Sequence, residues 1–280
     1  MISNTPDWRV LSFIVFLVVL ISAPFPDPTH AAEDLAKKSQ NPISNLVSIP
    51  IEFWHYDGIG EDSTVRTAVL RPVFPVRLGA VNLINRVSIP YLAVDAGVGG
   101  VDIGGIPSPQ TDLETSGLGN ILYQGFFSPA KPSKVKWGLG ITLELPTNEG
   151  RLGSDNWSAG PGVIMLTKHG KWVIGVITHN IWSFAGPSDE ANVNKFVFQY
   201  FINYNLGHGL YLNSTPTITA DWEKPSDQRW TVPFGGGIGK LFFFGKQPVD
   251  FNIQVFKNVE KPDLGAEWSV LFSTNFLFPK

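Results

Sequence analysis

The last residues of the chain alternate between two faces with a period of two. From Trp268 to Phe278, alternate positions carry Trp, Val, Phe, Thr, Phe and Phe, and the positions between them carry Ser, Leu, Ser, Asn and Leu. This period is that of a β-strand whose two faces meet different surroundings. A soluble sandwich offers a core and water to the two faces, whereas a membrane barrel offers lipid and a wet lumen.

Segments of this kind recur along the chain, separated by clusters of Gly, Pro, Asp and Asn. We predict twelve strands, near residues 47–56, 64–75, 81–92, 117–128, 135–146, 157–167, 171–184, 194–205, 210–222, 228–241, 249–259 and 266–278. The connections after even-numbered strands are tight, and those after odd-numbered strands are mostly longer or more acidic. Membrane barrels have an even strand number, short periplasmic turns, long outer loops and both termini inside. The pattern therefore favours an all-β fold, a transmembrane antiparallel up-and-down β-barrel.

Polar side chains at alternating positions mark the face that we expect to line the lumen. In the segment 135–146, for example, Ile141 is predicted to face lipid while its neighbour Thr142 faces inward. Aromatic residues gather at the strand ends, as interfacial girdles require. The candidate lumen-lining residues are Arg86, Lys136, Glu144, Lys195, Gln199, Asn203, Asp221, Arg229, Asn252 and Gln254.

The N-terminus has the composition of an export signal. An apolar run from Val10 to Ile21 follows Arg9, and small residues precede a cleavage point after Ala31. A membrane-anchoring helix needs about 17–25 apolar residues, which is more than this run supplies. We predict a cleaved signal peptide over residues 1–31, a mobile periplasmic lead-in over 32–46 and the barrel over 47–280.

Composition excludes several classes of function. The 280 residues carry 21 Lys and Arg against 24 Asp and Glu, and this net charge of −3 gives no electrostatic reason to bind nucleic acid. The chain has no cysteine, which excludes disulfides, thiolate catalysis and zinc–thiolate sites. No later segment is apolar enough for a helical span, so a membrane protein of this sequence has to be a closed barrel.

Three patterns suggest chemistry, and each has a simpler explanation. The glycine run before Lys240 is not followed by Ser or Thr, so it favours strand curvature and packing beside aromatics over a phosphate-binding loop. A hydrolase would need His55 or His179 beside a serine such as Ser88 or Ser214. The acidic loops match no calcium-binding pattern. We expect no catalytic residues, no metal and no cofactor.

The predicted lumen is narrow. Twelve strands tilted by about 40° and spaced ~4.8 Å apart give a backbone radius of roughly 12 Å, and inward side chains occupy much of it. The loop from Val94 to Ser116 contains 23 residues and five glycines. Two alternatives are open for this loop, because it could fold inward as a constriction or lie outside the pore.

An ordered set of motifs resembles a known family. Ser39 to Leu46 enters the first strand, and further motifs are Gly117 to Ile121, Phe126 to Pro132, Trp137 to Gly140, Ala159 to Gly175, Asn203 to Leu206, Arg229 to Pro233, Gly237 to Lys240 and Phe276 to Lys280. Together they resemble bacterial outer-membrane transporter barrels related to the MetA-pathway phenol-degradation family, whose members are sometimes mislabelled neuromedin U. The resemblance implies an outer-membrane barrel with a transport role and no catalytic residues. The C-terminal strand departs in one respect from the usual outer-membrane signal, in which an aromatic residue ends the chain. Here Pro279 and Lys280 follow the last aromatic residue, Phe278.

The leading functional hypothesis is a passive outer-membrane channel for small molecules, with both termini in the periplasm. The resemblance adds an alternative, a specific carrier of hydrophobic or aromatic compounds. A barrel enzyme such as a lipid hydrolase and a mainly structural barrel are further alternatives. The expected partners are outer-membrane lipid, a small-molecule solute and the barrel-assembly machinery during biogenesis.

Overall fold

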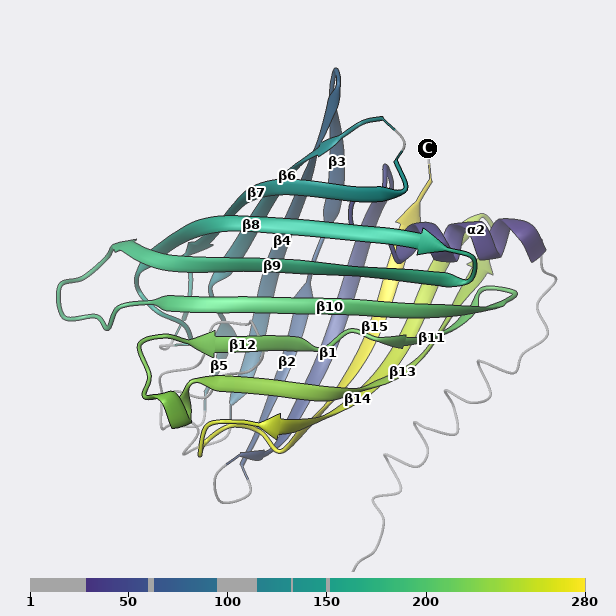
Figure 1. The fold of residues 1–280 in the computed structure, drawn as a ribbon. Helices are drawn as coiled ribbons and strands as arrows, with labels where there is room; N and C mark the ends of the chain where they lie inside the picture. The colour runs from purple at the N-terminus through teal and green to yellow at the C-terminus, as the bar shows by residue number, and fades with distance from the viewer. Residues whose placement is uncertain (1–28, 60–62, 95–114, 132, 150–151, 280) are drawn as a thin grey trace, which may run out of the picture.

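The computed structural model describes residues 29–59, 63–94, 115–131, 133–149 and 152–279 (Figure 1). The predicted signal peptide up to residue 28 and loop residues 95–114 lie outside these ranges. The elements are α2 (Thr29–Ser39), β1 (Val47–Ile59), β2 (Ser63–Leu70), β3 (Val73–Leu78), β4 (Val81–Val94), β5 (Thr115–Leu118), β6 (Ile121–Pro129), β7 (Val135–Leu145), β8 (Trp157–His169), β9 (Trp172–Ala185), β10 (Asn194–Gly207), β11 (Leu210–Ser214), β12 (Thr217–Asp221), the 3-10 helix η1 (Ser226–Gln228), β13 (Trp230–Phe244), β14 (Gln247–Glu260) and β15 (Trp268–Phe278). In the described part of the chain, no helix is long and apolar enough to cross a bilayer.

The strands form one antiparallel sheet that closes on itself. β1 pairs with β15 along its length, from Val47 opposite Phe278 to Asp57 opposite Trp268. Every other neighbouring pair along the sheet is also antiparallel, including β9 with β10. The fifteen segments make twelve strands, because three strands are each divided in two. The predicted twelve-stranded barrel is therefore confirmed.

The three interruptions were not predicted from the sequence. β2 and β3 are separated at Arg71-Pro72, β5 and β6 at Gly119-Asn120, and β11 and β12 at Thr215-Pro216. Proline has no N–H to donate to a ladder, so Pro72 and Pro216 account for two of the breaks. The flanking halves keep their neighbours in the sheet, because β2 and β3 both pair with β4.

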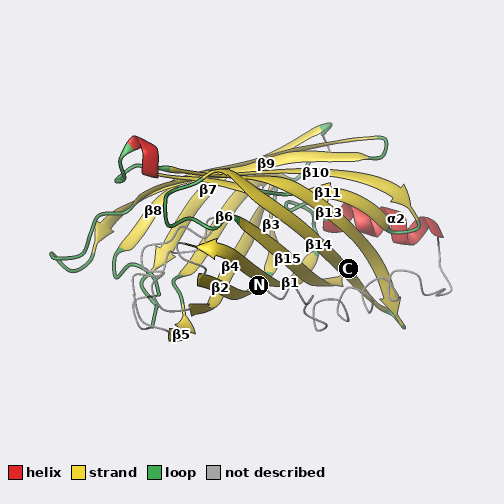
Figure 2. Ribbon diagram, turned by 90° about the horizontal axis from the view of Figure 1, so that it is seen from below, coloured by secondary structure: helices red, strands yellow, loops and turns green. Residues whose placement is uncertain are grey.

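The connections sort by length as predicted. At one end, two-residue turns at 79–80, 170–171, 208–209 and 245–246 join the strands, together with the longer turn 130–134. Gly170 and Gly245 have φ angles of 57° and 61°. Glycine adopts this left-handed conformation without strain, and it suits a tight hairpin. The opposite end carries the longer loops, whereas α2 and the C-terminus lie at the tight-turn end (Figures 1 and 2).

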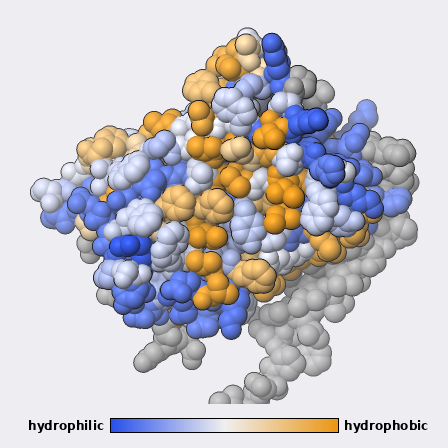
Figure 3. Space-filling model, in the orientation of Figure 1, coloured by the Kyte–Doolittle hydropathy of each residue, from blue (hydrophilic) through white to orange (hydrophobic). Residues whose placement is uncertain are grey.

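The outer surface of the barrel is apolar across its middle. Figure 3 shows apolar side chains over the middle of the strands and hydrophilic ones toward both ends. Leu139 is 54% exposed and Ile141 45% exposed, whereas Thr142 is fully buried on the opposite face of β7. This is the facing predicted for the strand, and an apolar belt is what the lipid-exposed part of a membrane barrel requires.

Aromatic residues gather near both ends of the barrel. Trp222 and Trp230 pack edge to face at the outer-loop end, with ring centroids 5.6 Å apart. At the tight-turn end, Trp172 packs against Tyr204 at 4.7 Å, and the Lys171 Nζ lies 6.0 Å from the Tyr204 ring centroid. Trp and Tyr prefer this amphipathic position at a lipid–water boundary.

Apolar side chains fill much of the barrel interior. One cluster lies under the outer loops and contains Tyr56, Ile59, Val65, Val69, Leu92, Val94, Leu152 and Ala266. A second cluster crosses the interior and contains Ile43, Val73, Ile84, Phe126, Ile164, Leu166, Val173, Ile177 and Phe201. Because these side chains are close-packed, the space left inside the barrel is small.

The N-terminal segment differs from the predicted mobile lead-in. α2 packs beside β10 and β13 at the tight-turn end of the barrel. Its Ala32, Leu35 and Ala36 form an apolar cluster with Leu241 and Leu277, which come from β13 and β15. Burial of these side chains ties the helix to the barrel, at roughly 25 cal/mol per Å² of apolar surface removed from water.

Adjacent positions on β15 test the assignment of the two faces. Ser273 lines an interior cavity and Thr274 points to the opposite, outer face. We expect Thr274→Arg to destabilise the barrel by about 2–4 kcal/mol, because arginine is placed in lipid near mid-membrane, whereas Ser273→Arg costs much less. Guanidinium unfolding from phospholipid vesicles measures both variants. Equal destabilisation would contradict the assignment.

Candidate functional site

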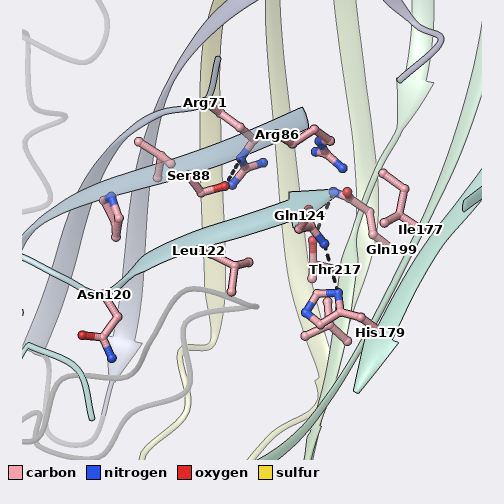
Figure 4. A pocket seen from close by; sticks show the side chains of 13 residues that line it. Arg71, Arg86, Ser88, Asn120, Leu122, Gln124, Ile177, His179, Gln199 and Thr217 are labelled. Atoms are coloured by element: carbon pink, nitrogen blue, oxygen red, sulfur yellow. Dashed lines mark hydrogen bonds between the residues drawn. The ribbon is translucent and has the colours of Figure 1, made fainter. Parts of the chain in front are cut away.

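Two polar cavities inside the barrel share part of their walls. The larger has a volume of about 200 Å³ and lies toward α2, because Ser39 and Gln40 line it. The smaller has a volume of about 50 Å³ and lies closer to the outer loops (Figure 4). Four residues line both cavities, namely Arg71, Arg86, Ile177 and Gln199. The two cavities therefore meet at one height along the barrel axis, where Arg71 and Arg86 face the interior.

Arg71 is held in a network at the break between β2 and β3. Its Nη1 donates to Glu52 Oε1 at 3.0 Å, and its Nε donates to Ser88 Oγ at 3.0 Å. The second oxygen of Glu52 accepts a hydrogen bond from Trp54 Nε1 at 3.1 Å. Because Glu52 forms an ion pair with Arg71 at this level, the charge of Arg71 is largely compensated.

Arg86 has a different environment. It projects inward from β4, two residues before Ser88 on the same face, and only 9% of it is exposed. Its Nε is buried without a hydrogen-bond partner among the described residues. Buried polar groups are normally satisfied, and an unsatisfied one calls for a specific explanation.

The opposite wall of the larger cavity is a hydrogen-bonded polar surface. Gln254 Oε1 accepts from the backbone N–H of Thr215 at 3.0 Å, and Gln254 Nε2 donates to Asn252 Oδ1 at 2.9 Å. Gln199 Nε2 donates to the carbonyl of Thr215 at 3.3 Å and to Thr217 Oγ1 at 3.2 Å. The break at Thr215-Pro216 thus frees backbone groups that these amides satisfy.

The chain after α2 forms the floor of the larger cavity. Asp250 accepts two hydrogen bonds, one from Ser39 Oγ and one from Tyr211 OH, each at 2.9 Å. Gln40 and Asn205 exchange amide hydrogen bonds at 3.1 and 3.0 Å. These contacts join the N-terminal segment to strands on the tight-turn side, so this segment occupies the corresponding end of the lumen.

The candidate lumen residues fall into several groups in the structure. Arg86 and Gln199 line both cavities, and Asn203, Asn252 and Gln254 line the larger one. Glu144 is buried and accepts a hydrogen bond from Asn120 Nδ2 at 3.1 Å. Lys195 lies opposite Asp221 in the pairing of β10 with β12, and Lys136 lies on β7.

Arg229 is placed differently from its prediction as a lumen residue. It lies in the loop between η1 and β13, with its guanidinium 5.3 Å from the Trp222 ring centroid. Conversely, Glu52, Arg71 and Ser88 were not among the candidate lumen-lining residues, although they line the cavities. The alternation of polar residues along 47–56 places Glu52 on one face with Trp54, but only the cross-strand register brings Arg71 to it.

The histidines do not form a hydrolytic relay with the candidate serines. His179 lines the smaller cavity with Ser88, yet its Nδ1 lies 3.3 Å from Gln124 Nε2, and Ser88 Oγ accepts from Arg71. His55 packs against Trp268, with ring centroids 5.7 Å apart. A nucleophilic serine needs a direct hydrogen bond to its base, and none joins these groups among the described residues.

The glycine run before Lys240 lies within β13, as its simpler interpretation requires. A β-carbon at Gly239 would collide with the ring of Tyr211, so glycine allows that ring to pack against the strand. Within the described ranges, no group of three His, Cys, Asp or Glu residues could hold a metal ion.

Comparisons with known proteins identify the fold. No protein-family model and no curated sequence matches the chain. The COG4313 outer membrane channel from Pseudomonas putida F1 matches with a TM-score of 0.58 and 16% identity, over 84% of this chain and 96% of that chain. The CymD monoaromatic hydrocarbon channel matches with a TM-score of 0.43 and 9% identity, over 84% of this chain and 88% of that chain. The Pseudomonas putida toluene transporter TodX has a TM-score of 0.39 and 8% identity, over 83% and 87%.

The chain therefore has the fold of an outer-membrane β-barrel. At these identities the likeness shows the fold alone, because one fold hosts many functions. The resemblance to the phenol-degradation barrels stays a prediction.

Asp250 provides a test of how the N-terminal segment is held. We expect Asp250→Ala to loosen residues 32–42, since it removes the acceptor for Ser39 and Tyr211, an effect of about 1–3 kcal/mol. Trypsin cleavage after Lys37 and Lys38 should then be roughly tenfold faster. Asn252→Ala is the matched control, because Asn252 lies on the same face of β14 and does not bond to the N-terminal segment. Equal cleavage rates in both variants would refute this role.

Proposed function

We propose that the protein is an outer-membrane channel for the passive passage of small solutes. The observation that carries the proposal is the pair of polar cavities that meet inside a closed barrel. Packed apolar side chains occupy much of the remaining interior, so the solutes are small. A polar lumen enclosed by a lipid-facing sheet is the arrangement by which barrels conduct solutes across the outer membrane.

The proposed orientation places the tight turns, α2 and both termini in the periplasm. Short periplasmic turns and longer outer loops are the usual arrangement of bacterial barrels, and the barrel-assembly machinery would insert the chain this way. The turns at this end carry Lys131, Lys134, Lys171 and Lys246. Glu149, Asp155, Asp189, Glu190, Glu223 and Asp263 lie in the loops at the opposite end.

A second candidate function is a specific carrier of hydrophobic or aromatic compounds. One observation favours it, because Val69, Leu122, Ile177 and Val197 contribute apolar side chains to the smaller cavity. These side chains lie beside polar and charged groups, so a purely apolar solute would satisfy only part of that wall. We propose no enzymatic role.

Removal of residues 32–46 tests the channel proposal. The mature protein should fractionate with the outer membrane and show low conductance in planar bilayers, because its N-terminal segment occupies the tight-turn end of the lumen. The shortened variant should conduct at least severalfold more, since the floor of the larger cavity is removed.

Retarded migration of unheated, folded protein on gels is the control for correct assembly. A shortened variant that folds and inserts yet conducts no more than the full mature chain would contradict the role of the N-terminal segment. Absence of conductance from both proteins would refute the channel itself.

A further inference from the structure

The smaller cavity has an unusual balance of charge. Arg71 and Arg86 line it, and none of the aspartates or glutamates in the described ranges does. Glu52 reaches Arg71 from the larger cavity and forms an ion pair with it at 3.0 Å. The other lining carboxylate of the larger cavity, Asp250, already accepts from Ser39 and Tyr211. Among the described residues where the cavities meet, Arg86 is therefore the arginine that forms no ion pair, and its Nε has no hydrogen-bond partner.

Arg86 is also positioned to bind a ligand. It is nine-tenths buried, its Nε has no partner among the described residues, and its side chain extends into both cavities. Figure 4 shows its head on the side of Ile177 and Gln199, while the head of Arg71 turns to Ser88. A guanidinium presents its N–H groups in a planar fork that matches a carboxylate.

The surroundings of Arg86 favour an organic anion over a bare inorganic one. Val69, Pro90, Leu122 and Val197 supply apolar contacts in the smaller cavity. Hydroxyl and amide groups from Ser88, Gln124 and Thr217 line the same cavity and can fix the orientation of a ligand. A single carboxylate balances the charge of the Arg86 guanidinium, whereas a phosphate dianion would leave excess negative charge in a confined space.

We propose that Arg86, with Arg71 and Ser88 beside it, binds the carboxylate of a small organic monocarboxylate as it passes between the two cavities. The inference rests on the proposed channel function for its biological meaning, but binding itself does not require transport. Arg86 supplies the charge-assisted hydrogen bonds, and the ion pair with Glu52 fixes Arg71 and, through it, Ser88. The apolar wall contacts the body of the solute.

Calorimetric titration of benzoate into folded, detergent-solubilised protein tests the site. Arg86→Met should weaken benzoate binding roughly ten- to a hundredfold, the effect of losing a charge-assisted hydrogen bond. Arg77→Met is the matched control and should bind as wild type, because Arg77 is exposed near the turn at 79–80 and lines neither cavity. Arg86→Lys keeps the charge without the fork, and its binding should be intermediate.

Two further probes separate the alternatives. Benzyl alcohol should bind wild type much more weakly than benzoate; equal binding would mean apolar recognition only and would overturn the proposal. Inorganic phosphate that binds as well as benzoate would overturn the assignment to an organic carboxylate. Failure of benzoate to bind wild type would refute the site even if the protein conducts.

A measurement on wild type alone keeps the proposal testable if Arg86→Met does not fold. The reversal potential in a potassium chloride gradient should show preference for chloride over potassium, because the narrow level carries a net positive charge. Preference for potassium would contradict the inference, whereas absence of any conductance would refute the channel proposal and leave the binding result to decide the site.

Discussion

The pairing of β1 with β15 is the constraint on which the rest of the structure depends. In a bilayer every backbone N–H and C=O has to be bonded within the protein, and each unsatisfied group costs several kcal/mol. A sheet meets this requirement only when it has no edge, and eleven residue pairs from Val47 with Phe278 to Asp57 with Trp268 remove the edge here. Closure over twelve strands also sets the radius of the barrel and hence the space available for side chains.

That space is shared between a packed apolar interior and a polar passage. Ile43 from the N-terminal segment completes the apolar cluster around Phe126 and Phe201, whereas Gln199, Asn252 and Gln254 form a hydrogen-bonded wall beside the larger cavity. The two strand breaks at prolines contribute to this division, because Thr215 and Arg71 bond to residues of other strands at those points. A buried Arg86 whose Nε has no partner among the described residues is costly in such an interior, and charged groups retained inside membrane proteins usually serve a function.

The sequence predicted what depends on local periodicity and not what depends on distant contacts. Strand alternation placed Gln199, Asn203, Asn252 and Gln254 on the face that lines the larger cavity, because a period of two holds along any strand. Residues 32–46 were expected to be a mobile lead-in, because Leu241 and Leu277, the apolar partners of Leu35 and Ala36, are more than two hundred residues away in sequence.

Two further differences between the prediction and the structure have identifiable causes. Arg229 was assigned to a strand that in the structure begins one residue later, at Trp230, and strand boundaries are the least certain part of such predictions. The ion pair between Arg71 and Glu52 joins β1 to the residue that follows β2, so it requires the cross-strand register, which periodicity does not specify.

Closure of the barrel can be tested directly with pairs of introduced cysteines. The chain contains no cysteine of its own that could form a competing disulfide. Ile51 and Thr274 are directly opposite in the pairing of β1 with β15. Facing positions on antiparallel strands bring their Cα atoms within the range of about 4.4–6.8 Å that a disulfide spans. With Ile51→Cys and Thr274→Cys together, we expect a disulfide to form in membrane-inserted protein. The control pair is Ile51→Cys with Phe278→Cys. These two positions lie roughly 13 Å apart along the strand, so we expect no disulfide between them. Failure of the first pair to form, or equal formation in both pairs, would contradict a barrel closed in this register.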